Sequence, residues 1–126
     1  MIINTPISLG ELIDKISILK IKQTKINDKK KCSFIKEELS LLQSILLNSA
    51  VDKKINVYLD KLTEVNSKLW RIEDDIRDCE RNKQFDQKFI DLARAVYFTN
   101  DQRSRIKLKI NNHFDSKIVE VKFYKK

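Results

Sequence analysis

Glycine and proline are almost absent from this chain, which contains one of each among its 126 residues. Because tight turns and strand connections depend on these two residues, their scarcity argues against an all-β or α/β fold and favours helices. A single glycine also excludes the glycine-rich loops that cradle phosphates in nucleotide-binding folds. The sequence therefore predicts an all-α protein, and we expect no cofactor.

Histidine and cysteine are also scarce, with one histidine and two cysteines. The single histidine, His113, excludes metal sites built on two histidines and leaves a Ser-His-Asp triad without another base. Cys32 and Cys79 are too few for a disulfide framework and lack the spacing of a metal-binding pair. We expect no metal site, and we expect Cys79 to pack as a small apolar side chain rather than to act in redox chemistry.

The sequence contains no long apolar run and no recognisable targeting segment. A membrane-spanning helix needs about 18 or more apolar residues, and a signal peptide needs a basic start followed by an apolar stretch, which MIINTPISLGEL does not provide. We therefore expect a cytoplasmic protein without membrane contact. Its length predicts one domain, residues 1–126.

The stretch from Ile55 to Cys79 carries the clearest positive signal. Its apolar residues recur at intervals of three and four: Ile55, Tyr58, Leu62, Val65, Leu69, Ile72, Ile76 and Cys79. This pattern is the a/d seam of a heptad repeat and predicts a long helix from about residue 52 to about residue 83. A turn at residues 82–86 would follow, and then a fourth helix that returns alongside the third.

Two shorter helices are predicted before this pair. Ser8 followed by Glu11 forms a capping box at the start of the first helix, and Asp28 can cap the second. Gly10 has two interpretations: a tolerated glycine near a helix start, or a gap that exposes backbone N–H groups to an anion. The predicted fold is an all-α, antiparallel up-down bundle of about four helices built on a long, coiled-coil-like hairpin.

The segment after His113 has a different period. Val119, Val121 and Phe123 alternate with charged residues, which predicts a short C-terminal strand. The N-terminal residues MIIN are its only plausible partner within the chain. Because an up-down bundle returns the C-terminus to the end where the chain began, we expect a two-stranded ribbon there.

The predicted helix lengths indicate a projecting hairpin. The first two helices have roughly 17–20 residues and the last two roughly 27–32, so the second hairpin is longer by roughly 15 Å. Its tip would expose apolar seam residues, which a second subunit would cover: Ile72, Ile76, Phe85, Phe89 and Leu92. We therefore expect a homodimer, and we expect Trp70 to be buried against the first hairpin.

The densest polar segment is RIEDDIRDCER, residues 71–81, in which eight of eleven side chains are charged. Arg103 occupies an apolar seam position of the fourth helix, so it needs a buried partner. Folding the hairpin about residues 84–85 places Asn66 nearest to Arg103, with Glu73 as a longer-range partner.

Two interpretations of this polar region compete. In the first, a groove binds an anionic or sugar-type ligand, and its carboxylates and arginines could perform acid–base chemistry. Its candidate residues are Glu73, Arg77, Arg94, Tyr97, Asn100, Asp101 and Arg103. In the second, which long helical hairpins show more often, these residues form ion pairs along the helices and one buried polar layer that fixes register.

The net charge of +8 is concentrated near the C-terminus, where the last 25 residues carry eight basic and two acidic side chains. A basic surface can bind nucleic acid in a salt-dependent way, here through Arg105, Lys107 and Lys109. Lysine-rich helix faces more often serve solubility. The sequence therefore favours a protein-interaction or adaptor module first, a ligand-binding protein or enzyme second, and nucleic-acid binding third.

The motifs SLGELIDKISIL, LWRIEDDIRDCER and ND-x-R resemble those of a small family of uncharacterised bacterial proteins, many of them marine. The resemblance extends over nearly the whole chain and is weakest in residues 34–55 and at the ending VKFYKK. It implies a stand-alone cytoplasmic helical protein and supplies no established catalytic residues.

Overall fold

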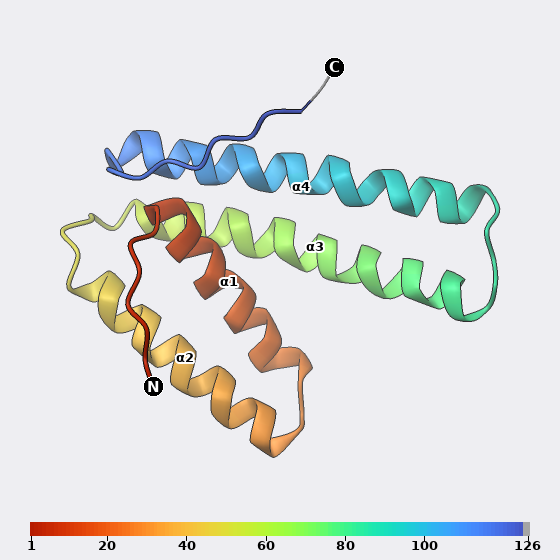
Figure 1. Cartoon of the computed structure of the whole chain (residues 1–126), viewed down its shortest axis with the longest axis horizontal. Coiled ribbons are helices and arrows are strands. Elements are labelled where there is room, and N and C mark those ends of the chain that lie inside the picture. The colour runs from red at the N-terminus through yellow and green to blue at the C-terminus, as the bar shows by residue number, and fades with distance from the viewer. Residues whose placement is uncertain (125–126) are drawn as a thin grey trace.

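The computed structural model describes residues 1–124 and contains four helices, which confirms the all-α prediction (Figure 1). The helices are α1 (Leu9–Lys25), α2 (Lys29–Leu47), α3 (Ile55–Arg81) and α4 (Gln87–His113). Each lies within a few residues of the range that the apolar period predicts.

Side-chain caps set three of the four helix starts. The side chain of Ser8 accepts a hydrogen bond from the backbone N–H of Glu11, and that of Asp28 accepts one from Lys31. Asp86 caps α4 in the same way, and α3 begins without a side-chain cap. Because a capping residue leaves its own backbone extended, these residues also turn the chain between helices.

The two hairpins cross obliquely instead of lying parallel in one bundle. Figure 1 shows α3 and α4 side by side, with α1 and α2 running diagonally away from them. Among the described helices, α1 packs on each of the other three, whereas α2 packs on α1 alone. The predicted helical bundle is therefore present, but its two hairpins cross, and α1 rather than α3 packs on all the other helices.

The core lies where α1 crosses the longer hairpin. Ile13 and Ile16 of α1, Leu62 of α3 and Ile110 of α4 are essentially inaccessible to solvent. From the other side, α2 adds Ile35 and the neighbouring Leu39 to the same cluster. Burial of these aliphatic side chains provides the main favourable term for folding.

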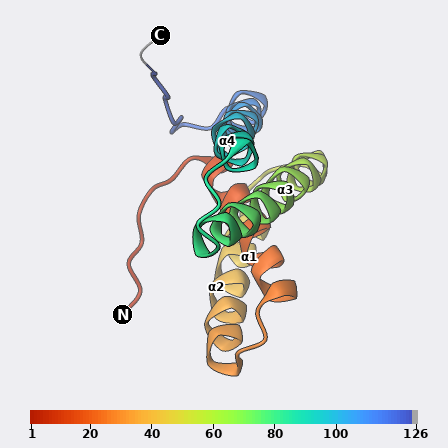
Figure 2. The same cartoon turned by 90° about the vertical axis from the view of Figure 1, so that its right-hand side faces the viewer.

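The predicted C-terminal strand is absent, and residues 1–124 contain no strand at all. Figure 2 shows the N-terminal segment and the chain after α4 leaving the helices in opposite directions. The N-terminal segment lies beside α2, where Ile3 and Ile7 line a pocket of about 380 Å³ with Leu42. The two ends therefore have no opportunity to pair, although α4 does end beside the start of α1.

The hairpin of α3 and α4 extends beyond α1, as its length predicts. Each of its helices has 27 residues, compared with 17 in α1 and 19 in α2. The expectation of an exposed apolar seam at its tip is only partly met, because Ile72 and Cys79 are buried between the two helices while Phe85 is exposed. Within residues 1–124, no helix is both long and apolar enough to cross a membrane.

Candidate functional site

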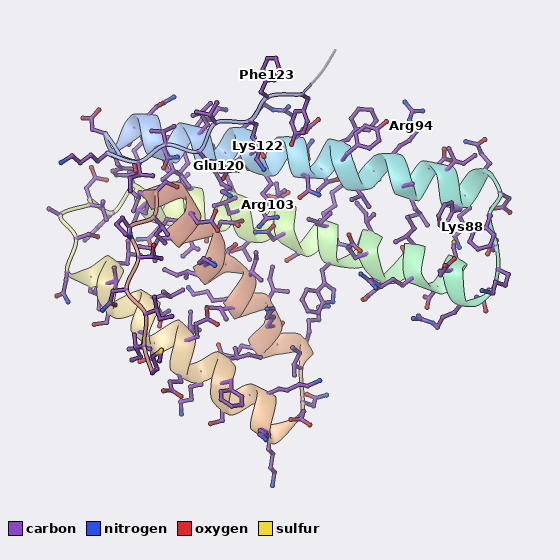
Figure 3. All side chains as sticks on the ribbon, in the orientation of Figure 1. Lys88, Arg94, Arg103, Glu120, Lys122 and Phe123 are labelled. Atoms are coloured by element: carbon purple, nitrogen blue, oxygen red, sulfur yellow. The ribbon has the colours of Figure 1, made fainter. Side chains whose placement is uncertain are left out.

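A buried ion pair joins the two hairpins. Arg103 of α4 donates from Nε to Oδ1 of Asp14 at 2.9 Å and from a terminal nitrogen to Oδ2 at 2.5 Å. The Asp14 side chain is 1% exposed and that of Arg103 is 26% exposed. This hydrogen bond and the charge of Asp14 raise the pKa of Arg103 above its ordinary value despite the opposing effect of burial. Figure 3 shows Arg103 between α4 and α1.

Asp14 also binds the third helix. The amide nitrogen of Asn66 donates to Asp14 Oδ1 at 2.9 Å and to the hydroxyl of Ser17 at 2.8 Å. The prediction that Arg103 has a buried partner is confirmed, but Asn66 is not that partner. Asn66 and Arg103 both donate to the carboxylate of Asp14, which belongs to the first hairpin.

Lys107, one turn beyond Arg103, forms the centre of a second group of charges. Its Nζ lies 2.7 Å from a carboxylate oxygen of Glu11, 3.0 Å from one of Glu120 and 4.0 Å from one of Asp14. Burial lowers the pKa of Lys107, but hydrogen bonds to the first two carboxylates outweigh this effect and leave it above its ordinary value. Lys107 therefore remains charged and ties α1 to the chain that follows α4.

The start of α1 is closed by one side chain from the end of α4 and one from the chain just after it. The N–H of Gly10 donates to Asn111 Oδ1 at 2.7 Å, and the N–H of Leu9 donates to the Ser116 hydroxyl at 3.1 Å. A Cβ atom at residue 10 would lie 2.5 Å from the backbone oxygen of Lys107. Gly10 therefore permits a close approach of two helices, and these N–H groups are not available to an anion.

A groove of about 780 Å³ lies beside this cluster, between α4, the start of α1 and the chain after α4. Four of the predicted site residues line it: Tyr97, Asn100, Asp101 and Arg103. Glu11, Ser104, Lys107, Glu120, Lys122 and Tyr124 line it as well. The structure thus gathers part of the predicted set in one groove.

The remaining predicted residues lie elsewhere. Glu73 and Arg77 pair with each other on the surface at 3.6 Å and line a separate pocket of about 370 Å³, in the angle between α1 and α3. Arg103 borders that pocket too, and Trp70 lies there, half-buried beside Ile18 of α1. Arg94 lines neither pocket, because its guanidinium lies 5.5 Å from the ring centre of Phe98 on the outer face of α4.

Sequence reasoning missed the acidic partners from outside the long hairpin. Asp14 could have been found from two polar stripes at helical spacing, formed by Gly10, Asp14 and Ser17 on α1 and by Arg103, Lys107 and Asn111 on α4. Each stripe interrupts an apolar face, which indicates that the two face each other. Glu120 gave no comparable signal, because it follows a turn.

The charged side chains of this cluster pair with one another and connect the two hairpins, and we call this connection the joint. Within residues 1–124, every fully buried side-chain nitrogen or oxygen has a hydrogen-bond partner. Two basic residues of the C-terminal region, Arg103 and Lys107, turn inward, so they are not available to a nucleic acid. No three metal-ligating side chains lie close enough to hold a metal ion in the described part of the chain.

Comparison with known proteins identifies a family. The sequence profile of a family of unknown function, DUF6165, matches residues 3–126. No curated protein and no solved structure matches the chain.

Proposed function

Since the chain belongs to DUF6165, a family of unknown function, we propose from its geometry that it is a protein-interaction module. Its partner binds the α4 patch, which consists of Ile90, Arg94, Tyr97 and Phe98. These residues follow one another at intervals of four, three and one along α4, so they share the side of the helix that α1 and α3 leave open.

The exposure of two adjacent aromatic rings carries this proposal. Tyr97 and Phe98 are 50% and 51% exposed, and their ring centres lie 4.6 Å apart. Arg94 stacks on the Phe98 ring, and Ile90 is exposed one turn further along. Tyrosine and arginine are the residues that most often dominate binding energy at protein interfaces, and a rigid helix presents them without a large loss of entropy.

The charged cluster supports this proposal because all of its charged side chains already have partners within the protein. Asp14, Arg103, Lys107, Glu11 and Glu120 satisfy one another, so these charges serve the joint between the hairpins. A ligand would have to displace these partners to bind them. The exposed apolar face of α4 has no such partner within the described residues.

A pull-down with matched variants tests the proposal. Tagged wild-type protein is expected to capture a stoichiometric protein from a lysate of its source, and the double variant Ile90→Ala/Phe98→Ala is expected to lose it. Val57→Ala, at an exposed apolar position of α3, is the control and should retain the partner. Equal capture by all three proteins, or capture of nothing, would contradict the proposal.

A second function, binding of an anionic or sugar-type ligand, is favoured by the groove of about 780 Å³. Two tyrosines, Tyr97 and Tyr124, offer ring faces there, and Asn100, Ser104 and Lys122 offer hydrogen bonds. Screening of sugar phosphates by NMR chemical-shift changes tests this function. Binding that Asn100→Ala and Lys122→Ala weaken, and that Lys88→Ala on the distant tip leaves unchanged, would support it.

A further inference from the structure

The tail segment, residues 117–124, is an extended chain whose backbone is almost unpaired. Within residues 1–124, its backbone takes part in one hydrogen bond, from the Ser116 hydroxyl to the oxygen of Ile118 at 2.7 Å. Its sequence, KIVEVKFY, is rich in β-branched and aromatic residues, which favour strands. Such a segment has the residue composition of a β-strand and lacks only a neighbouring strand with which to form hydrogen bonds.

One ion pair holds one face of the tail segment against α4, and a second lies within the segment. Glu120 binds Lys107 at 3.0 Å and Lys122 at 2.8 Å. The opposite face is apolar and open, since Val121 is 84% and Phe123 is 93% exposed. Figure 3 shows Phe123 pointing away from α4 while Glu120 lies next to it.

We propose that the tail segments of two copies of this chain pair as antiparallel strands centred on Val121, and so form a homodimer. In this register, the numbers of any two residues that face each other add up to 242. Val121 therefore faces its own copy, Glu120 faces Lys122, Val119 faces Phe123 and Ile118 faces Tyr124.

The register is self-complementary in charge and in shape. It produces two ion pairs between strands, two pairs of an aliphatic with an aromatic residue on each face, and one central valine pair. Directly opposed pairs of these kinds each stabilise a ribbon by about 0.2–1 kcal/mol relative to alanine pairs. A shift by one residue either way loses the central pair of Val121 and places Glu120 opposite an apolar residue, Val121 or Phe123.

The surroundings provide room for the second strand. A groove of about 390 Å³ runs along the outer side of the tail segment, between Val119 and Val121 on one side and Arg105 and Leu108 of α4 on the other. A two-stranded ribbon alone is marginally stable in water, whereas a ribbon packed on a helix is not so limited. The incoming strand would bury these apolar side chains.

A second copy fits better than the other available strands. The N-terminal segment of the same chain leaves in the opposite direction, as Figure 2 shows, and lies beside α2. An antiparallel pair of identical strands has a two-fold axis, so one contact completes the assembly and no edge repeats to form a fibre. The α4 patch shares no residue with the tail segment, although Tyr97 of the patch and Tyr124 of the tail segment line the same groove.

Sedimentation velocity of the full chain over micromolar to hundred-micromolar concentrations tests the dimer. Wild-type protein is expected to shift from monomer to dimer. Val121→Lys places two lysines opposite each other in the dimer alone and should raise the dissociation constant about tenfold or more. Val57→Lys makes the same change on exposed α3 and should not alter it. A wild-type monomer throughout, or equal effects of the two variants, would overturn the proposal.

Disulfide formation between single introduced cysteines tests the register. Val121→Cys should form linked dimers readily, because opposed residues of neighbouring strands lie about 4.5–5.5 Å apart at Cα. Val119→Cys alone should not, since its copies would lie about 13 Å apart, but its mixture with Phe123→Cys should. Dimers that form equally at all three positions, or with wild-type protein through Cys32, would contradict this register. Loss of dimer by α4 patch variants would instead indicate that the second copy occupies the patch.

Discussion

At the scale of single residues, local chemistry was predictable and long-range partners were not. Ser8, Asp28 and Asp86 cap their helices because a capping side chain acts within three residues of its own position. The need of Arg103 for a buried partner followed from its place on an apolar seam. Its partner, Asp14, is 89 residues away in the other hairpin, and only the matching polar stripes of α1 and α4 point to it.

Gly10→Ala is expected to destabilise the protein, although alanine is the better helix former. Propensity alone would favour alanine by about 1 kcal/mol. Its Cβ would lie 2.5 Å from the backbone oxygen of Lys107, and such an overlap costs about 1–3 kcal/mol. Denaturation by urea measures the change in free energy of unfolding. A more stable variant would show that α1 and α4 are not in this close contact.

The attachment of the tail segment depends on the charge of Glu120. Its hydrogen bonds to Lys122 and Lys107 lower the pKa of this carboxyl below its ordinary value of 4.5. At a pH above the ordinary pKa, the lowered pKa of Glu120 stabilises the attached state. This contribution is lost as the pH falls through the lowered pKa. The attachment is therefore complete at pH 7, begins to weaken below about pH 4.5, and is lost as the pH falls through the lowered pKa.

Heteronuclear NOE values of residues 118–124, measured at concentrations where the protein is a monomer, check this expectation. They should decrease from pH 7 to pH 3 in wild-type protein. In Glu120→Gln they should be low at both values. An attachment that is insensitive to both the pH and the substitution would show that other contacts hold the segment.

At the scale of elements, periodicity predicted the helices well and failed for the tail segment. The seam of α3 persists through Ile55, Leu62 and Ile72, which are all buried, and a helix completes its hydrogen bonds within itself. A strand completes its hydrogen bonds only with a neighbour. The alternation in KIVEVKFY therefore indicated a segment that favours a β-strand. It could not show whether the single chain offers a second strand to pair with it.

The projecting part of the long hairpin should open more readily than the part that α1 covers. Figure 1 shows the C-terminal part of α3 beside α4 and beyond the end of α1, whereas Leu62 and Asn66 also contact α1. Native-state hydrogen exchange measures the free energy of opening at each amide. Amides of residues 74–81 are expected to open at a free energy below that of residues 59–66. Equal values along α3 would mean that the hairpin unfolds as one unit.

At the scale of the whole molecule, the crossing of the two hairpins was the feature that sequence could not provide. Antiparallel neighbours within each hairpin followed from short connections. The oblique placement depends on contacts between distant residues, namely Gly10 with Lys107 and Asp14 with Arg103. These same contacts use the charges that would otherwise have defined a ligand site.

A double-mutant cycle locates the coupling that holds this joint. Asp14→Ala and Arg103→Ala should be strongly non-additive in the free energy of unfolding, with a coupling of about 1–3 kcal/mol. Glu73→Ala and Arg103→Ala should be additive within about 0.5 kcal/mol, because Glu73 pairs with Arg77 on the surface. Coupling of Glu73 with Arg103 would show that the two side chains interact across the pocket that both of them line.

The free energy of unfolding of Arg103→Ala tests most directly whether the charged cluster is a structural joint, which leaves the surface of the protein to carry its function. Loss of the guanidinium would leave the nearly inaccessible Asp14 carboxylate without its main partner, and we expect a destabilisation of about 3–5 kcal/mol. Arg105→Ala, an exposed neighbour on α4, is the control and should change stability by less than about 0.5 kcal/mol. Unchanged or increased stability of Arg103→Ala would contradict the account, because it would mark an arginine that is retained at a cost to the fold for binding a ligand.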